Sequence, residues 1–371
     1  MAAAATDAGE AALMRFARNA AGVADVARFT DRLDVRSPSE FALDHVPRAL
    51  NAPVLDDSER TRIGTLHAQV SGFAARKAGA ALVSRNIAHI IDTLAHDKPL
   101  DWAPLVYCWR GGQRSRALAH VLGEIGFGAV QLEGGYRAWR RHVLENLGTL
   151  PQTVRLVVIC GLTGSGKSRL IAALHATGAQ VLDLEGLANH RGSLLGDAPD
   201  GPQPSQKHFE TTIYDVLSTC DRGRPLFVES ESKRIGRLQI PEMLLATMRA
   251  APCIHLDTAL PLRVEVLLED YAHFLRAPAL LNQRLAPLAI LHGKQTIERW
   301  QQASSAGEFA SLAEELLTLH YDPSYARSIE RNFVRLAGAH SIAPRGAHPA
   351  AFMLLAQQAI AAADQLMQTS A

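Results

Sequence analysis

Short apolar runs alternate with helical patterns through residues 23–147. The run PLVYC is almost entirely apolar, and the stretch RSRALAHVLGEIG that follows has apolar positions at helical spacing. Strands that alternate with helices in this way are typical of a parallel sheet with crossover connections. We therefore predict an α/β domain here, with strands at 32–37, 104–108 and 129–135 and helices at 37–46, 73–94, 114–126 and 135–147.

A second α/β pattern begins after the stretch 146–153 (NLGTLPQT), where glycine and proline interrupt a helical pattern. The apolar run VRLVVIC is typical of a buried strand, and the helical pattern after it stops at Gly178. From Leu260 onward the chain is mainly helical. We predict an N-terminal extension at 1–22, a first domain at 23–147, a linker at 148–153 and a second domain at 154–371, with strands at 154–160, 179–185, 224–230 and 253–257.

Length and composition fit a protein of two domains. A chain of 371 residues, 47% hydrophobic and 20% charged, is long enough for two domains that each bury a core. No apolar run approaches the ~18 residues of a membrane span. The N-terminus lacks the basic start and apolar centre of a secretory signal. We expect a cytoplasmic protein with no membrane partner.

The chain has four cysteines, Cys108, Cys160, Cys220 and Cys253. They are scattered without the spacing of a disulfide framework or a zinc site. Cysteine chemistry should therefore involve a single thiol.

The net charge of +1 excludes a broadly basic surface for nucleic acids. Two local clusters, 136–142 (YRAWRRH) and 232–237 (SKRIGR), could still contact phosphates. For either cluster alone, solvated arginines on a helix face are the simpler interpretation.

The stretch 106–115 (VYCWRGGQRS) places one cysteine after an apolar run and before glycines, arginines and a serine. A cysteine nucleophile reacts as the thiolate, whose pKa falls near backbone N–H groups, a helix N-terminus and cations. A cysteine buried only for packing would not explain these neighbours. We predict that Cys108 is a reactive thiol in an anion-binding loop, with Arg110 and Arg114 stabilising the anion. The other loop residues are Trp109, Gly111, Gly112, Gln113 and Ser115.

This loop resembles the active-site loop of the rhodanese superfamily. The stretches LDVRSPSEFALDHVPRALNAP and LEGGYRAW resemble that superfamily's first and closing signatures. Asp44 and Arg48 depart from the first signature, because glycine is usual at both positions. Five residues separate Cys108 from Arg114, one more than in ordinary sulfur-transferring members and as many as in phosphatase and arsenate-reductase relatives. The resemblance implies a rhodanese-like parallel-sheet domain that receives a larger or differently shaped anion.

The stretch 161–168 (GLTGSGKS) matches the pattern G-x-x-x-x-G-K-[ST] in full, between an apolar strand and a helix. In this motif backbone amides surround a di- or triphosphate, the lysine reaches its oxygens, and the hydroxyl can hold Mg²⁺. We predict a P-loop NTPase-like α/β domain with a helical C-terminal region. The motif leaves open whether the diphosphate belongs to a nucleotide. The predicted phosphate-binding residues are Gly161, Gly164, Ser165, Gly166, Lys167 and Ser168.

Polar residues gather in DLEGLANHRGSLLG and PLFVESES, each of which includes or follows a predicted strand. Open α/β sheets bind ligands at the carboxyl edge of their strands. We predict substrate or switch loops at 183–196 and 202–210, with Mg²⁺ as a candidate ion, no firm metal site and no tightly bound cofactor. A role in a turn or a helix cap stays equally open for each residue. The candidates are Asp183, Glu185, His190, Arg191, Glu229 and Glu231.

The order of these motifs is similar to that of the bacterial tRNA 2-selenouridine synthase family. That family joins a rhodanese-like domain to a P-loop domain, as YCWRGGQRS, GLTGSGKS, LDLEGLANHRGS and FVESESKRIG follow one another here. The resemblance implies a transferase that replaces the sulfur of wobble 2-thiouridine in tRNA by selenium from selenophosphate. It also implies S-geranylation of that sulfur with geranyl diphosphate. An enzyme that makes selenophosphate is a candidate partner.

Under this scheme the two domains perform different steps. Cys108 is the carrier or nucleophile for selenium, and Lys167 neutralises the departing diphosphate. A thiocarbonyl sulfur is displaced poorly from a pyrimidine, whereas an S-alkylated sulfur leaves as a thiol, so alkylation comes first. The scheme requires a sulfur that substrate can reach and room for an oxyanion beside Lys167.

Two other functions stay open from the residues. The five-residue spacing fits a rhodanese-superfamily cysteine phosphatase or arsenate reductase fused to a small-molecule kinase, although no acidic general acid is evident near the loop. The other alternative is a nucleotide-gated sulfur carrier, which would load a persulfide without changing tRNA.

Overall fold

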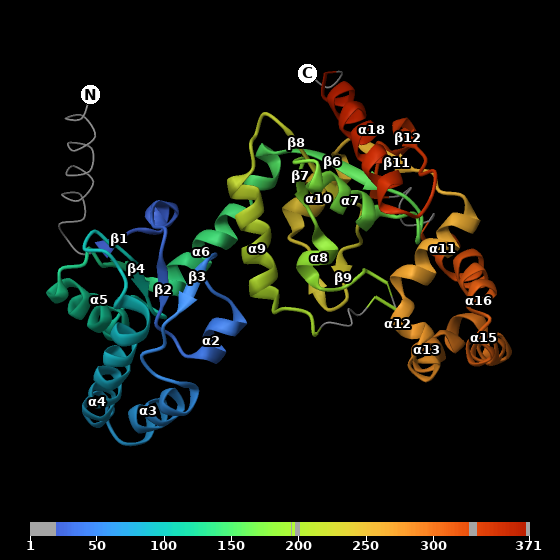
Figure 1. Cartoon of the computed structure of the whole chain (residues 1–371). Helices are drawn as coiled ribbons and strands as arrows, with labels where there is room; N and C mark the ends of the chain where they lie inside the picture. The colour runs from blue at the N-terminus through green and yellow to red at the C-terminus, as the bar shows by residue number, and fades with distance from the viewer. Residues whose placement is uncertain (1–19, 194, 197–200, 326–331, 369–371) are drawn as a thin grey trace. The chain divides into compact units, whose positions relative to one another are not determined.

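The computed structural model describes residues 20–193, 195–196, 201–325 and 332–368, and it divides between Asn146 and Leu147 into two compact units. Each unit contains its own five-stranded parallel sheet (Figure 1). The extension predicted over residues 1–22 lies outside the described residues as far as residue 19. Its next two residues, Ala20–Ala21, form an edge strand that pairs in parallel with 131–132.

The first unit is a parallel sheet with helical connections. Its elements are β1 (Ala20–Ala21), η1 (Val23–Arg28), β2 (Arg32–Asp34), α2 (Pro38–Leu43), β3 (Ala49–Asn51), α3 (Asp57–Gln69), α4 (Gly72–Ile90), η2 (Ile91–Ala95), β4 (Leu105–Tyr107), α5 (Gln113–Ile125), β5 (Val130–Leu132) and α6 (Gly135–Leu147). The strand order is β1-β5-β4-β2-β3. Leu33 of β2 pairs with Val106 of β4, and both are fully buried with Leu118 and Leu122 of α5. Burial on both faces explains why β4 reads as an unbroken apolar run, and the predicted α/β architecture is confirmed.

Two helices, α3 and α4, connect β3 to β4, whereas the sequence predicted only one, at 73–94. The second of them, α4, matches that prediction, and Ser71 caps it by accepting a hydrogen bond from the N–H of Ala74 at 3.0 Å. None of the residues of α3 is buried, so this helix has no apolar stripe for periodicity to reveal. Its start is marked instead by a capping box, in which Asp56 accepts from the N–H of Glu59 at 2.7 Å.

The second unit begins with η3 and a parallel sheet in the order β12-β11-β6-β8-β7. Its elements up to residue 256 are η3 (Leu150–Thr153), β6 (Arg155–Cys160), α7 (Lys167–Ala176), β7 (Gln180–Leu182), α8 (Leu184–Ala188), α9 (Gln206–Thr219), β8 (Pro225–Glu229), β9 (Arg234–Ile235), β10 (Leu238–Gln239), α10 (Glu242–Ala250) and β11 (Cys253–Leu256). The edge strand β12 (His340–Ile342) and the helix α18 (Pro349–Gln368) come from the end of the chain. The helix α18 lies beside α7 (Figure 1). Phe352 and Leu355 of α18 join Leu170 and Leu174 of α7 in one core.

The described residues between β11 and β12 are mainly helical, as predicted. It comprises α11 (Leu260–Asp270), α12 (Ala272–Leu275), α13 (Pro278–Leu285), η4 (Ala286–Leu288), α14 (Ala289–His292), α15 (Lys294–Ala306), α16 (Phe309–Glu315), η5 (Leu316–Tyr321) and η6 (Leu336–Gly338). Trp300, Leu285 and Leu312 are central to a separate core in this part. The helices therefore form a cluster of their own beside the sheet of this unit.

Two stretches predicted as loops contain helices. Within 183–196, residues Leu184–Ala188 form α8. Within 202–210, α9 begins at Gln206, and Ser205 caps it by accepting from the N–H of His208 at 3.1 Å. The loop prediction was wrong for these residues because the caps and first turns of helices share the polar composition of loops.

Candidate active sites

Cys108 lies directly after β4, where the chain turns into α5. Its sulfur accepts hydrogen bonds from the backbone N–H of Gly112 and from the hydroxyl of Ser115, each at 3.2 Å. Gln131 Nε2 donates to that hydroxyl at 2.7 Å and holds it in place. Burial opposes the thiolate, but the hydrogen bonds from Ser115 and the loop amides outweigh it, so the pKa of the Cys108 thiol is below its ordinary value.

The loop around Cys108 contacts the segment after β5 through backbone atoms. The N–H of Tyr136 donates to the carbonyl of Cys108 at 2.8 Å. Gly135 has a φ of +57°, and a Cβ there would lie 2.3 Å from that carbonyl oxygen and 2.4 Å from the amide nitrogen of Gly111. Only glycine fits such a contact, which gives the stretch LEGGYRAW a structural role beside the thiol.

The residue Cys108 is only 3% exposed, so its sulfur lies at the base of the loop. The scheme drawn from the sequence requires a sulfur that a substrate can reach. The burial of Cys108 restricts the directions from which a substrate could approach it. The loop residues Arg110, Gly112 and Gln113 are exposed. A substrate therefore has to approach the sulfur over this part of the loop.

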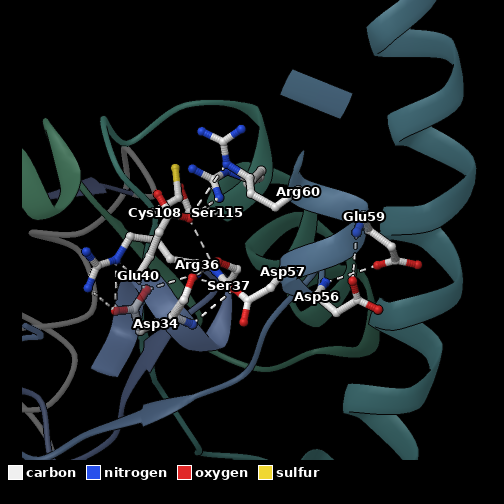
Figure 2. Close-up of polar contacts among 12 residues, drawn as sticks. Asp34, Arg36, Ser37, Glu40, Asp56, Asp57, Glu59, Arg60, Cys108 and Ser115 are labelled. Atoms are coloured by element: carbon white, nitrogen blue, oxygen red, sulfur yellow. Dashed lines mark hydrogen bonds and ion pairs between the residues drawn. The ribbon is translucent and has the colours of Figure 1, made fainter. Parts of the chain in front are cut away.

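The two arginines of the loop differ in their contacts. Arg114 Nη1 donates to Oε2 of Glu40 at 3.1 Å. Nε of Arg60 lies 3.7 Å from the same oxygen (Figure 2). Arg110 is exposed to solvent. Neither Glu40 nor Arg60 was expected from the sequence, because both belong to helices far from Cys108 along the chain.

The two departures from the first rhodanese signature, Asp44 and Arg48, lie in different environments. Asp44 is buried, and its Oδ2 accepts a hydrogen bond from the hydroxyl of Tyr136 at 2.7 Å. Burial and this carboxylate raise the pKa of the phenol. The Tyr136 ring also lies 3.9 Å from the guanidinium of Arg36 and stacks on Trp109 at 5.3 Å. Arg48 has a φ of +62°, the left-handed region in which glycine is usual.

The stretch 161–168 forms the turn between β6 and α7 and borders a cavity of about 360 Å³. Gly164 and Gly166 have φ values of +78° and +89°. A Cβ at Gly166 would lie 2.5 Å from the ring of Phe352, so glycine is also needed there for α18 to pack. The turn is open to a ligand, as the P-loop motif requires.

Lys167 begins α7 and faces both backbone and acidic groups. Its Nζ donates to the carbonyl of Gly161 at 2.8 Å and lies 5.2 Å from the ring centre of Tyr325. Burial opposes the charged lysine, but Tyr325 and the carboxylates of Glu185 and Glu231 outweigh burial and raise its pKa. The lysine is therefore held as a cation at the cavity.

Several carboxylates lie near Lys167 and Ser168. The hydroxyl of Ser168 donates to Oε2 of Glu185 at 2.6 Å, and the N–H of Glu185 donates to Oε1 of Glu229 at 2.7 Å. Burial, with repulsion from Asp183 and Glu185, raises the pKa of Glu229 well above its ordinary value. Burial and Glu185 raise the pKa of Glu231 to about 8. This negative cluster would be relieved by a cation.

The cavity brings together part of the predicted site. The predicted residues in its walls are Gly164, Ser165, Gly166, Lys167, Ser168, Glu185, Arg191 and Glu231. Those that do not line it are Gly161, Asp183, His190 and Glu229. Asp183 caps α8, and His190 is buried with Nδ1 accepting from the N–H of Gly192 at 3.1 Å. The guanidinium of Arg191 lies 5.0 Å from the ring centre of Tyr271.

A small apolar pocket of about 60 Å³ adjoins this cavity. The shared wall residues are Thr163, Ser193, Leu267, Tyr271 and Tyr321. Beyond them the lining is mainly aliphatic and aromatic, including Leu195, Phe274, Leu281, Leu312 and Leu316. These residues also belong to the separate core of the helical region.

Comparison with known proteins agrees with this arrangement. Residues 23–142 match the family model of the rhodanese-like domain, and residues 154–286 match that of the tRNA 2-selenouridine synthase AAA domain. A tRNA 2-selenouridine synthase from Sulfurovum sp. is 31% identical over 339 residues, which cover 83% of this chain and 91% of that protein. The chain belongs to the tRNA 2-selenouridine synthase family.

Other family members show similar agreement. The tRNA 2-selenouridine synthase of Bdellovibrio bacteriovorus is 33% identical over 351 residues, 81% of this chain and 89% of that protein. That of Cupriavidus pinatubonensis is 33% identical over 343 residues, 83% and 91% respectively. A crystal structure of an N-terminal domain from Clostridium difficile is 29% identical and covers 34% of this chain and 98% of that chain, but its TM-score of 0.31 is too low to indicate a shared fold.

Family membership confirms the resemblance drawn from the motifs and the predicted succession of domains, a rhodanese-like domain before a P-loop domain. It identifies the chain as an enzyme, because the relatives are synthases. It therefore favours a selenouridine synthase over a phosphatase fused to a kinase and over a sulfur carrier.

Several contacts of the P-loop involve residues that were not expected from the sequence. The hydroxyl of Tyr325 accepts from the N–H of Gly161 at 3.2 Å. Arg263 is buried, donates to the carbonyl of Thr163 at 2.8 Å and pairs with Asp322 at 2.5 Å. These residues belong to the helical region that follows β11. No motif marks them, so only the folded chain reveals their positions.

The described residues include no group of three or more His, Cys, Asp and Glu side chains arranged to hold a metal ion. Magnesium does not need such a group, since it is commonly bound by one or two carboxylates together with substrate phosphates. Ser168 and Glu185 offer oxygen donors of that kind. In the part of the chain that the structure describes, every helix is too short or too polar to cross a membrane.

Proposed function

We propose that this chain replaces the sulfur of wobble 2-thiouridine in tRNA by selenium, in two steps at two sites. Membership of the tRNA 2-selenouridine synthase family supports the net reaction. The two-step scheme rests on the presence of two anion sites, the hydrogen-bonded thiol of Cys108 and the P-loop cavity with its apolar neighbour. We also infer a cytoplasmic location, because tRNA is the substrate.

In the first step the thiouridine sulfur attacks C1 of geranyl diphosphate. A carbon–sulfur bond forms, the carbon–oxygen bond to diphosphate breaks, and the base loses its N3 proton. Lys167 and the P-loop amides would balance the charge of the departing diphosphate. The geranyl chain would extend toward the apolar pocket beside Leu267 and Tyr271. The alkylated sulfur is then ready to leave as a thiol.

In the second step selenium replaces the alkylated sulfur. Selenium has the same oxidation state in selenophosphate and in selenouridine, so this step needs no oxidant. The thiolate of Cys108 would attack phosphorus, forming a sulfur–phosphorus bond and releasing selenide. Selenide would add to C2 of the base and expel geranylthiol, and water would then hydrolyse the phosphocysteine. Arg110, Arg114 and the loop amides would stabilise the tetrahedral anion.

The residues beside the P-loop fit Mg²⁺ as a cofactor. Ser168 and Glu185 would hold it, since their oxygens are 2.6 Å apart and lie near Glu229 and Glu231, whose pKa values are raised. Bound there, the ion would supply positive charge to the diphosphate. On the selenium side, the substrate must come from a reaction that phosphorylates selenide, so a selenophosphate-producing enzyme is a candidate partner.

We assign contacts with the RNA backbone to the hairpin β9–β10. It follows Ser232, in the wall of the P-loop cavity, and the basic residues Lys233 and Arg234 are exposed. Ser232 Oγ donates to the carbonyl of Arg234 at 2.6 Å. A Cβ on Gly236 would lie 2.3 Å from Oε1 of Gln203, so the hairpin is closely packed against the segment before α9. An ordered basic hairpin beside a site is suited to positioning phosphates.

Purified protein tests this function directly. With tRNA that carries 2-thiouridine, we expect geranyl diphosphate alone to produce S-geranyl-2-thiouridine, and added selenophosphate to convert it to 2-selenouridine. Mass spectrometry of the nucleosides measures both products. Absence of selenouridine with both substrates would contradict the function. Selenouridine formed without geranyl diphosphate would contradict the two-step order. Turnover of an aryl phosphate or arsenate instead would support the phosphatase or reductase alternative.

A further inference from the structure

Glu40 of α2 lies between two arginines beside the Cys108 loop. Oε2 of Glu40 is 3.1 Å from Nη1 of Arg114, at the start of α5, and 3.7 Å from Nε of Arg60, in α3. Glu40 and Arg114 are mostly buried, with 22% and 18% of their side chains exposed, and Arg60 is 42% exposed. Two guanidinium groups from different helices thus meet at one carboxylate oxygen.

The arrangement follows from how α2 and α3 begin. Glu40 is the third residue of α2 and accepts from the N–H of Ser37 at 3.3 Å in a capping box. Asp57, the first residue of α3, accepts from the N–H and the hydroxyl of Ser39 at 3.1 and 2.6 Å. These bonds join the first turns of the two helices, which places Arg60 opposite Glu40 (Figure 2).

Arg60 and Arg114 share a single carboxylate oxygen, Oε2 of Glu40. One carboxylate faces two guanidinium groups, whose planar N–H donors match the oxygens of phosphate as well as those of carboxylate. Figure 2 shows the side chain of Arg60 extending from α3 toward the loop that carries Cys108 and Ser115. A tetrahedral oxyanion with two or more charges would satisfy both arginines better than the single charge of Glu40.

We propose that Arg60 joins Arg114 in binding the tetrahedral oxyanion that is delivered to Cys108, and that Glu40 occupies this position until the anion displaces it. The identity of that anion as selenophosphate rests on the proposed function. Glu40 keeps both guanidinium groups directed at the site in the absence of substrate. It also sets a threshold, because only an anion of higher charge competes with it.

The test uses thiophosphate, a tetrahedral anion of the same shape as selenophosphate, and the full-length protein. Iodoacetamide alkylates Cys108, and mass spectrometry of the Cys108 peptide measures the rate of alkylation. Bound thiophosphate should slow this reaction, so the thiophosphate concentration that halves the rate reports the affinity for the anion. Arg60→Gln should raise that concentration about tenfold, and Arg60→Lys should restore part of the loss. Arg62→Gln is the matched control on the exposed side of the same helix and should change nothing.

Glu40→Gln should change the affinity for thiophosphate in the direction opposite to Arg60→Gln. Glutamine keeps the capping box of α2 but removes the competing charge. The thiophosphate concentration that halves the rate of Cys108 alkylation should therefore fall severalfold. Thermal unfolding of each variant shows whether the fold is retained. Equal protection in Arg60→Gln and the wild-type protein would overturn the role of Arg60, and weaker protection in Glu40→Gln would overturn the competition. Protection that depends on Arg60 in a protein that does not selenate tRNA would refute the proposed function and leave this inference standing.

Discussion

The lowered pKa of Cys108 is due to hydrogen-bond donors within a few residues of it. Its pKa is lowered, against the effect of burial, by the hydroxyl and N–H of Ser115 and by the amides of Gly112 and Arg110. The sequence predicted amides, a helix start and arginine charge as joint causes. In the structure the guanidinium of Arg114 is directed at Glu40, so the amides and the hydroxyl are the direct stabilisers.

Ser115→Ala should therefore make Cys108 less acidic. A hydrogen bond to a charged group contributes about 1.5–3 kcal/mol, and one pKa unit corresponds to about 1.4 kcal/mol, so the pH midpoint of alkylation should rise by about one unit. The measurement is the rate of iodoacetamide labelling of the Cys108 peptide against pH, with Cys108→Ser as the blank. An unchanged midpoint would show that the amides alone stabilise the thiolate.

Gly135 and Gly112 offer a matched pair of glycines for testing the backbone contact beside the thiol. A Cβ at Gly135 would lie 2.3 Å from the carbonyl oxygen of Cys108 at a positive φ, whereas a Cβ at Gly112 would meet nothing within 4 Å. Gly135→Ala should lower the free energy of unfolding by about 2 kcal/mol or more, because the strained φ and the close contact both oppose it. Gly112→Ala should be nearly neutral. Urea unfolding of both variants, followed by tryptophan fluorescence, makes the comparison, and equal stability would show that the loop relaxes around the added methyl group.

At the scale of elements, the sequence predicted the helices that bury an apolar stripe and the strands that are short apolar runs. The strands β4 and β6 and the helices α5 and α7 match their predicted positions closely. The helix α3 was missed because none of its residues is buried. The edge strand β12 was missed because it is only three residues long and two of them, His340 and Ser341, are exposed. The start of α9 was missed because a capping serine is also a typical loop residue.

The hairpin β9–β10 is also an element whose proposed function could not be predicted from the sequence alone. The stretch SKRIGR contains its basic residues, but only the structure shows that they sit on an ordered hairpin after a wall residue of the P-loop cavity. Antiparallel pairing of Arg234 with Gln239 and of Ile235 with Leu238 sets its register. Ile235 and Leu238 are buried, so the basic residues are left on the solvent side.

Replacing Lys233 and Arg234 together by alanine should weaken tRNA binding without changing the preference among tRNAs. Each lost phosphate contact should reduce the slope of log affinity against log salt by about 1. Fluorescence anisotropy with labelled tRNA at several salt concentrations measures both quantities. Arg76→Ala with Lys77→Ala removes the same charge from exposed positions of α4 and serves as the control. Equal slopes for the two double variants would argue against a phosphate contact by the hairpin.

At the scale of the whole molecule, the sequence could describe the central motif of each site but not the residues that surround it. The Cys108 loop and the P-loop are each one continuous stretch of sequence, so their motifs can be recognised from the sequence alone. Beside the Cys108 loop lie Glu40 and Arg60, and the P-loop is contacted by Arg263 and Tyr325. All four residues come from segments that are remote in the sequence. Their positions depend on packing in each unit, which no local pattern records.

Because each unit has a hydrophobic core of its own, the two chemical steps should be separable by mutation. Cys108→Ser should abolish selenation and leave geranylation intact. Lys167→Ala should slow geranylation by about 10²–10³-fold, the typical cost of losing one stabilising donor to a developing anion. Nucleoside mass spectrometry after reaction with tRNA, geranyl diphosphate and selenophosphate distinguishes the two outcomes.

The decisive experiment combines the two defective proteins. Lys167→Ala protein supplied with tRNA that is already S-geranylated should form 2-selenouridine at close to the wild-type rate, because its Cys108 site is unchanged. A mixture of the Cys108→Ser and Lys167→Ala proteins with unmodified 2-thiouridine tRNA should also form it, after a lag in which geranylated tRNA accumulates and passes from one protein to the other. If Lys167→Ala fails on geranylated tRNA, the P-loop takes part in the selenium step as well, and the assignment of one step to each unit is wrong.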